Sequence, residues 1–236
     1  MHACLRLAAP QELAPQELMP QELVPQELAP HWRELLAQVE TTLAVVVAGR
    51  ESRLGALQGL LPPPQLAGRD LMVPGRVLYR NPHEMGLDRR VCAFAARACY
   101  GPALVLDCGT ALTLTHVDTD WAVRGLAIAA GYRCLQNAFD PIAPALAPLT
   151  GGTAPIDAIP DGTAQCLAVG RDAGWCGLVA ALVEDARRRL GAAGLDSSQI
   201  VVTGSDATRA LVAVQGGRHA PSLVHEGLWR LAYGPG

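Results

Sequence analysis

The chain has 236 residues, of which 50% are apolar and only 4% aromatic, and its net charge is −3. This length suits one large domain or two small ones, and the charge gives no general basic surface for nucleic acid. The sequence contains no lysine, which excludes a Walker-type phosphate loop and Schiff-base chemistry.

Compartment and membrane contact can also be predicted from composition. No apolar run approaches the ~18 residues that a membrane span needs, and no basic region followed by an apolar stretch opens the chain. The seven cysteines contain no Cys-x-x-Cys pair, so they fit neither a disulfide framework nor a zinc site and suit a reducing compartment. We therefore expect a cytoplasmic protein with no membrane partner.

The N-terminal part of the chain is repetitive. Residues 10–29 repeat the pattern Pro-Gln-Glu-Leu-x with a period of five, which matches neither the helical nor the strand period. Proline at every fifth position also removes a helical hydrogen bond each time. We predict that residues 1–30 form a low-complexity arm, extended or disordered, either without function or translated from upstream of the natural start.

From residue 31 onward, hydrophobic spacing predicts helices, strands and connections. The first part reads as a helix at 31–43, a buried strand at 43–49, a loop at 57–68, short strands within 69–82 and a helix at 83–100. The second part reads as strands at 103–106, 111–117 and 122–129, a helix after Gly131, a long helix at 165–193, a strand-turn-helix at 199–212 and a helix at 226–233. Three successive strands followed by helices indicate an α/β domain with a mixed sheet.

The stretch "LVLDCGTALT" places an acid, a glycine and a threonine at the turn between two of these strands. Backbone N–H groups in a glycine-containing turn can converge on an anion, and Gly109 lets the backbone approach a phosphate closely. Thr110 can add a hydroxyl donor, and Asp107 can orient Mg²⁺. Taken alone, an ordinary β-turn is the commoner explanation of this pattern.

Two further stretches carry polar residues at element ends. In "YRNPHEMGLDRR", Asp88 and Arg89 follow Gly86 at the start of an apolar helix. They could serve as a general base and an anion clamp, or as a capping carboxylate beside a solvated arginine. In "VVTGSDATRAL", the turn at Gly204 could abut a nucleotide or be a common strand-to-helix connection.

Together, in this order and at this separation, the three stretches resemble the type III pantothenate kinases of the acetate-kinase/Hsp70/actin superfamily, over about residues 70–233. The resemblance implies an α/β, actin-like or ribonuclease-H-like fold, a duplicated ββαβα-type arrangement with a mixed sheet. Residues 31–100 would form an incomplete N-terminal half and residues 101–236 the C-terminal half. It also implies ATP-dependent phosphorylation of pantothenate to 4'-phosphopantothenate, the first step of coenzyme A synthesis, by a homodimer that uses Mg²⁺ and a monovalent cation, K⁺ or NH₄⁺.

The resemblance assigns a role to individual residues. Asp88 would be the catalytic base. Asp107, Gly109 and Thr110 would form a phosphate-binding hairpin, with Asp107 at the metal, and Gly204 would lie near the adenosine. The pantothenate pocket would be lined by Tyr79, Gly86, Leu87, Arg89 and Thr163.

The sequence departs from the family's pattern in two main places. The family opens with a second phosphate hairpin of the form Asp-x-Gly-Asn-Thr, and nothing like it precedes Leu43. Where a carboxylate often binds the monovalent ion, this chain has Thr115, with Asp118 and Asp120 close by but out of register. Three hypotheses follow: a working pantothenate kinase, a catalytically degenerate relative that binds ligands or regulates a partner, and a sugar or acyl kinase of the same superfamily.

Overall fold

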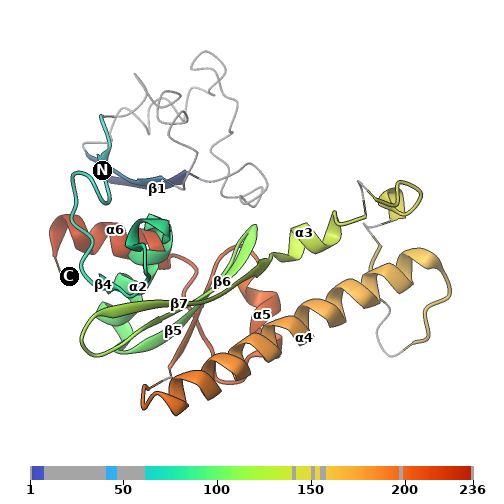
Figure 1. Cartoon of the computed structure of the whole chain (residues 1–236). Helices are drawn as coiled ribbons and strands as arrows, with labels where there is room; N and C mark the ends of the chain where they lie inside the picture. The colour runs from blue at the N-terminus through green and yellow to red at the C-terminus, as the bar shows by residue number, and fades with distance from the viewer. Residues whose placement is uncertain are drawn as a thin grey trace. The chain divides into compact units, whose positions relative to one another are not determined.

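The computed structural model describes residues 2–7, 41–46, 62–139, 142–149, 152–154, 158–196 and 199–234 (Figure 1). The strands are β1 (His2–Leu7), β2 (Thr41–Val46), β3 (Gln65–Leu66), β4 (Arg76–Val77), β5 (Ala103–Cys108), β6 (Ala111–Val117), β7 (Ala122–Ala130), β8 (Ile200–Thr203) and β9 (Arg218–His219). The α-helices are α2 (Leu87–Tyr100), α3 (Tyr132–Gln136), α4 (Thr163–Ala192), α5 (Ala207–Ala213) and α6 (Leu223–Tyr233). Two short 3-10 helices are η3 (Pro82–Glu84) and η4 (Ala147–Leu149).

These strands form two sheets. The smaller has the order β1-β2-β3, with parallel pairing throughout. The larger has the order β4-β7-β6-β5-β8-β9. In it, β5 and β8 are parallel and place Asp107 opposite Thr203, and both strands are buried along their whole length. A continuous apolar strand of this kind is typical of the centre of a sheet that is covered on both faces.

The chain divides into two compact units. The first contains residues 1–103, 115–125 and 222–236, and the second contains residues 104–114 and 126–221. The sequence predicts an incomplete half at 31–100 and a second half at 101–236, and this division stays a prediction. The C-terminal helix α6 belongs to the same compact unit as α2.

In the first unit, α2 and α6 lie side by side (Figure 1). Gly227 makes this approach possible, because a Cβ at this position would lie 2.6 Å from a methyl carbon of Val91. Phe94 of α2 also stacks on Trp121, with ring centroids 5.8 Å apart.

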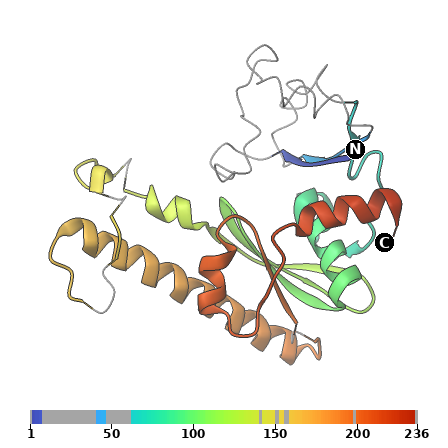
Figure 2. The ribbon, with the colours of Figure 1, turned by 180° about the vertical axis from the view of Figure 1, so that it is seen from behind.

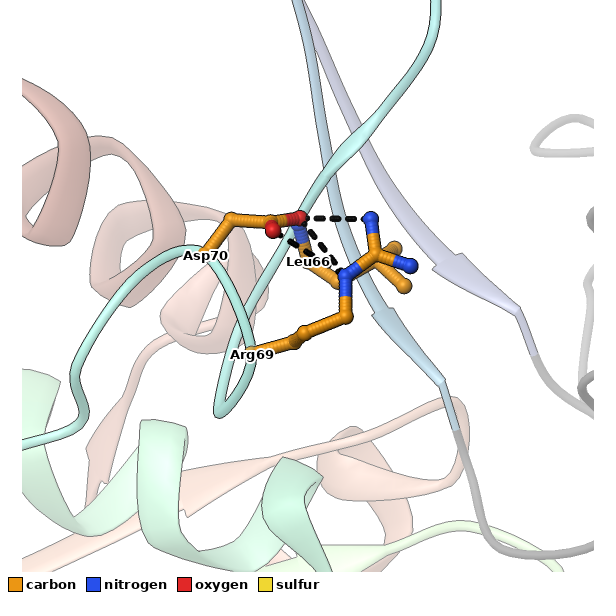
Figure 3. A network of polar contacts seen from close by, with 3 residues as sticks. All are labelled: Leu66, Arg69 and Asp70. Carbon is orange, nitrogen blue, oxygen red and sulfur yellow. Dashed lines mark hydrogen bonds and ion pairs between the residues drawn. The ribbon is translucent and has the colours of Figure 1, made fainter.

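The turn after β3 in the first unit is held by one carboxylate (Figure 3). The backbone N–H of Leu66 donates to Oδ2 of Asp70 at 2.8 Å, and the guanidinium of Arg69 donates to both carboxylate oxygens. The hydrogen bonds from Arg69, followed by the one from Leu66, lower the pKa of Asp70. This turn lies between β3 and β4, before the residues of the Arg89 site in the sequence.

The second unit has its core between α4 and the strands. Figure 2 shows α5 beside α4, and the two helices are in contact. The buried face of α4 carries Trp175, Val179 and Val183. Within the described ranges, α4 is the one helix long and apolar enough to cross a membrane. Length and composition are a weak indicator, because core helices pass the same test.

Most of the predicted elements are present. The three strands around the hairpin, the long helix, the strand-turn-helix and the final helix lie within a few residues of their predicted bounds. The mixed α/β fold class is confirmed.

The differences fall mainly at the N-terminal side. Residues 2–7 form β1 inside the predicted arm, and residues 41–43, at the end of the predicted helix, belong to β2. The remainder of the predicted arm and of that helix lies outside the described residues. The short strands β3 and β9 were not predicted, because two residues are too few to show a period.

Candidate active site

One candidate site, in the first unit, surrounds the guanidinium of Arg89, near the start of α2. Nε and Nη2 of Arg89 donate to Oγ1 of Thr115 on β6, at 3.1 and 2.9 Å. Nη1 donates to the hydroxyl oxygen of Tyr79 at 3.4 Å. Arg89 and Thr115 are both buried. The structure thus brings together two of the five residues predicted for the pantothenate pocket, with Thr115 as an additional member.

Asp88 precedes this guanidinium and lies in the first turn of α2. Its side chain is 8% exposed, and Oδ1 accepts the backbone N–H of Arg89 at 2.9 Å. A Cβ at Gly86 would come within 2.6 Å of the same oxygen, so the glycine leaves room for the carboxylate. Leu87 begins the helix between them. The first turn of α2 therefore carries two buried charged side chains, Asp88 and Arg89, directly after the N-cap Gly86.

Tyr79 is held over the backbone of β7. A Cβ built at Gly125 would overlap the hydroxyl oxygen of Tyr79 and lie 2.6 Å from its Cζ. The phenol can reach Arg89 only because residue 125 has no side chain. We call Tyr79, Asp88, Arg89, Thr115 and Gly125 the Arg89 cluster, and all five belong to the first unit.

Another candidate site is the hairpin between β5 and β6, residues 107–111, which belongs to the second unit. Asp107 ends the buried strand and is 4% exposed. The N–H of Gly109 donates to the carbonyl oxygen of Ala111 at 3.3 Å. Oγ1 of Thr110 is buried and has no hydrogen-bond partner in the described part of the chain. A buried hydroxyl without a partner is uncommon and calls for an additional donor or acceptor, such as a water or a ligand atom.

Two glycines let other segments approach this hairpin closely. The N–H of Gly131 donates to the carbonyl oxygen of Thr110 at 2.8 Å, and a Cβ there would overlap both Gly109 and Thr110. Gly204, with φ +94°, follows β8, and its Cβ would lie 2.6 Å from three backbone atoms of Cys108. The hairpin is therefore fixed from two sides by backbone contacts that exclude any side chain.

The residues after Gly204 add a buried carboxylate beside the hairpin. The N–H of Asp206 donates to the carbonyl oxygen of Cys108 at 3.0 Å, and Asp206 is 8% exposed. Burial raises the pKa of Asp206, while the charges of Arg133 and Arg209 oppose that rise. Burial, together with the charges of Asp107 and Asp206, also raises the pKa of the Cys108 thiol, so this cysteine is not a nucleophile at neutral pH.

The predicted residues thus fall into both units. Tyr79, Gly86, Leu87, Asp88 and Arg89 belong to the first, and Asp107, Gly109, Thr110, Thr163 and Gly204 belong to the second. Thr163 is exposed at the first position of α4. Its place in a pantothenate pocket stays a prediction.

Sequence reasoning missed Gly125 as a shaping residue and Asp206 as a member of the hairpin's surroundings. The glycine could have been noticed as an interruption of an apolar strand. Asp206 lies two residues after Gly204 and has the pattern of an ordinary helix start, so the sequence contains no separate signal for it.

The two implied cations fit these residues differently. Mg²⁺ is commonly bound through one or two carboxylates together with substrate phosphates, and the buried Asp107 at the hairpin suits that mode. In the described ranges, no group of three His, Cys, Asp or Glu residues could hold a metal by itself.

Thr115 does not suit a monovalent cation. Its Oγ1 already accepts two hydrogen bonds from a guanidinium, whose charge repels a second cation. Nearby, Asp118 is bound to Arg124 at 2.6 Å and to the N–H groups of Asp120 and Ala122. Burial opposes ionisation of Asp118, but these hydrogen bonds prevail and lower its pKa.

The arrangement resembles that of known proteins. A solved structure of a protein named for the Baf family of transcriptional activators, from Campylobacter jejuni, superposes with a TM-score of 0.52 over 84% of this chain and 85% of its own. The sequences are 18% identical, so this likeness shows a shared mixed α/β fold and nothing finer.

The family follows from the sequence comparisons. A family model for type III pantothenate kinase matches residues 26–185, more than half of the chain. Proteins named type III pantothenate kinase from Stenotrophomonas maltophilia (strain K279a) and Alcanivorax borkumensis are 32% and 33% identical, over 66% and 65% of this chain and 62% and 61% of their own lengths. This chain therefore belongs to the type III pantothenate kinase family, although it spans only about three fifths of those relatives.

Proposed function

We propose that this chain binds ATP and pantothenate and transfers the γ-phosphoryl group of ATP to the hydroxyl of pantothenate. The observation that carries the proposal is the Arg89 cluster, in which a buried carboxylate adjoins a buried guanidinium at the start of one helix. A guanidinium suits the carboxylate of an anionic substrate, and an adjacent carboxylate suits proton removal from an alcohol. Names of the relatives support the same substrates.

In this mechanism, the pantothenate hydroxyl oxygen attacks the γ-phosphorus in line with the departing oxygen of ADP. A new P–O bond forms, the bond between the γ-phosphorus and the β,γ-bridging oxygen breaks, and Asp88 accepts the hydroxyl proton. The hydroxyl of Thr110, with hairpin N–H groups other than that of Gly109, would hold phosphate oxygens, a task that needs positioning and donors rather than a lysine.

Asp107 would hold Mg²⁺, which when bound supplies positive charge to the phosphate oxygens. The proposal includes no step through a monovalent cation, because Thr115 is engaged by Arg89. A cytoplasmic homodimer that acts without nucleic acid or a membrane stays part of the proposal.

The test is an ATP-coupled assay with pantothenate, in which phosphopantothenate is identified by mass spectrometry, for wild type and Asp88→Asn. The amide keeps the shape of the carboxylate but cannot accept the proton, so we expect kcat to fall by on the order of 10²–10⁴ with little change in the KM for pantothenate. Asp185→Asn, at an exposed carboxylate of α4, is the matched control. Equal kcat values for wild type and Asp88→Asn would remove Asp88 from the mechanism.

A second function is favoured by one observation: the sequence carries a single hairpin of the phosphate-binding type where the family's pattern has two. Each lost phosphate donor could cost on the order of 10²–10³ in rate. The chain would then bind pantothenate-like ligands or regulate a partner without transferring phosphate. A melting temperature that rises with pantothenate, in a protein that shows no ATP turnover, would favour this alternative.

A further inference from the structure

The second unit contains a group of arginines around one buried aromatic ring. Tyr132, the first residue of α3, is 5% exposed, and its hydroxyl donates to Oδ1 of Asp172 at 2.6 Å. The same oxygen accepts Nε of Arg171 at 2.7 Å, and Cζ of Arg171 lies 5.1 Å from the centroid of the tyrosine ring. Trp175 packs edge-on against the ring, with centroids 5.9 Å apart. The ring is therefore held in one orientation by its neighbours.

A second guanidinium rests on this ring. Cζ of Arg209 lies 4.3 Å from the centroid of Tyr132, a cation–π contact. Such a contact positions the guanidinium without using its N–H groups. Nε of Arg209 lies 3.6 Å from Oδ1 of Asp206, beyond the usual hydrogen-bond distance, and the side chain is 53% exposed. Its planar set of donors is therefore held in place but still open to a ligand.

Asp206 connects this guanidinium to the hairpin. Its backbone N–H donates to the carbonyl oxygen of Cys108. The positive charges of Arg133 and Arg209 lower the pKa of its carboxyl group, against the effect of burial. Oδ2 of Asp206 is buried and has no hydrogen-bond partner among the residues that the structure describes. A carboxylate oxygen is costly to bury without a partner and repels a phosphate, so an anion bound here would contact the guanidinium groups and not Asp206.

The chemistry of these residues suits a phosphate group. Guanidinium groups bind phosphate oxygens through two parallel N–H donors. In a chain without lysine, arginine is the one side chain that keeps a full positive charge at neutral pH. Arg209 lies beside Asp206, the charge of Arg133 also acts on Asp206, and Asp206 is bonded to the hairpin through Cys108. The neighbourhood therefore combines the open guanidinium of Arg209 with the hydroxyl of Thr110, which has no hydrogen-bond partner among the described residues.

We propose that Arg209, supported by the positive charge of Arg133, binds the phosphate groups of the nucleotide next to the hairpin at residues 107–111. Tyr132 acts as the positioning residue that holds Arg209. This inference rests on the proposed function for the identity of the anion, but the site itself is built entirely from residues of the second unit.

The test measures ADP binding by the full-length chain, using titration calorimetry without pantothenate, for wild type, Arg209→Gln and Arg133→Gln. Each substitution removes charge-assisted hydrogen bonds, so we expect the Kd for ADP to rise about ten- to a hundredfold, and the Kd for adenosine to change little. Arg188→Gln is the matched control, because Arg188 belongs to the same unit, is 68% exposed and pairs with Asp185. Arg209→Lys keeps the charge but loses the planar donors, and should recover only part of the affinity.

The outcomes separate this inference from the proposed function. If Arg209→Gln binds ADP as wild type does while wild type phosphorylates pantothenate, the inference fails and the proposed function stands. If Arg209→Gln weakens ADP but not adenosine while wild type forms no phosphopantothenate, the site is supported and the proposed function fails. Equal weakening of ADP and adenosine would also overturn the inference, because it would indicate a general loss of structure. Wild type that binds no ADP at millimolar concentration would overturn it as well.

Discussion

Replacing Gly204 by alanine should weaken the hairpin more than its backbone angle alone predicts. Gly204 has φ +94°, and a Cβ there would lie 2.6 Å from the N, C and O atoms of Cys108. Backbone atoms in the middle of a sheet cannot move aside as a flexible side chain can. Forcing a positive φ on alanine costs about 1–2 kcal/mol, and the overlap adds about 1–3 kcal/mol. We therefore expect Gly204→Ala to lower the free energy of unfolding by about 2–5 kcal/mol.

Gly216 provides the control, because its φ is +75° and no atom lies within 4 Å of its Cβ position. Gly216→Ala should cost only the backbone share, about 1–2 kcal/mol. Thermal unfolding would then separate the two variants, at about 2–4 °C in Tm for each kcal/mol in a chain of this size. Equal Tm values for the two variants would refute the reasoning, since they would mean that the hairpin moves aside without cost.

Two further predictions concern the positions of tyrosines. Gly125→Ala should displace Tyr79 and break its contact with Arg89, so the KM for pantothenate should rise about tenfold while ADP binding, measured by calorimetry, stays unchanged; an unaltered KM would contradict this account. Burial, aided by the hydrogen bond to Asp172, raises the pKa of Tyr132 to about 12, so the stability that this residue contributes is complete below the unfolded pKa of about 10 and is lost as the pH rises toward 12. Denaturant unfolding between pH 9 and 12 should therefore show a steeper loss for wild type than for Tyr132→Phe, and parallel curves would show that Tyr132 does not titrate as expected.

The parts of the site that could be predicted from the sequence are those written in consecutive residues. The hairpin at Asp107 lies between two apolar strands, and its glycine marks the turn. Asp88 and Arg89 directly follow Gly86 at the start of a periodic apolar helix. In both cases the local sequence pattern determines the secondary structure. The secondary structure in turn determines where on the backbone each polar side chain is attached.

The parts that could not be predicted depend on sheet order and strand register. Arg89 meets Thr115 across 26 positions of the chain, and that contact exists only because β6 presents Thr115 toward the start of α2. Arg209 meets Tyr132 only because the parallel pairing of β5 with β8 brings the turn at Gly204 against Cys108. Single-sequence periodicity contains no information on which strands become neighbours.

The structure explains one departure from the family's pattern, at Thr115. In the sequence, this residue only replaces a carboxylate. In the structure, its hydroxyl accepts two N–H groups of a buried guanidinium. A carboxylate at that position would form an ion pair with Arg89 and offset the positive charge that an anionic substrate needs to meet. A neutral acceptor instead orients the guanidinium without adding a further negative charge beside it. The threonine is therefore compatible with a pantothenate-binding role for Arg89, and it removes the reason to expect a monovalent cation at this position.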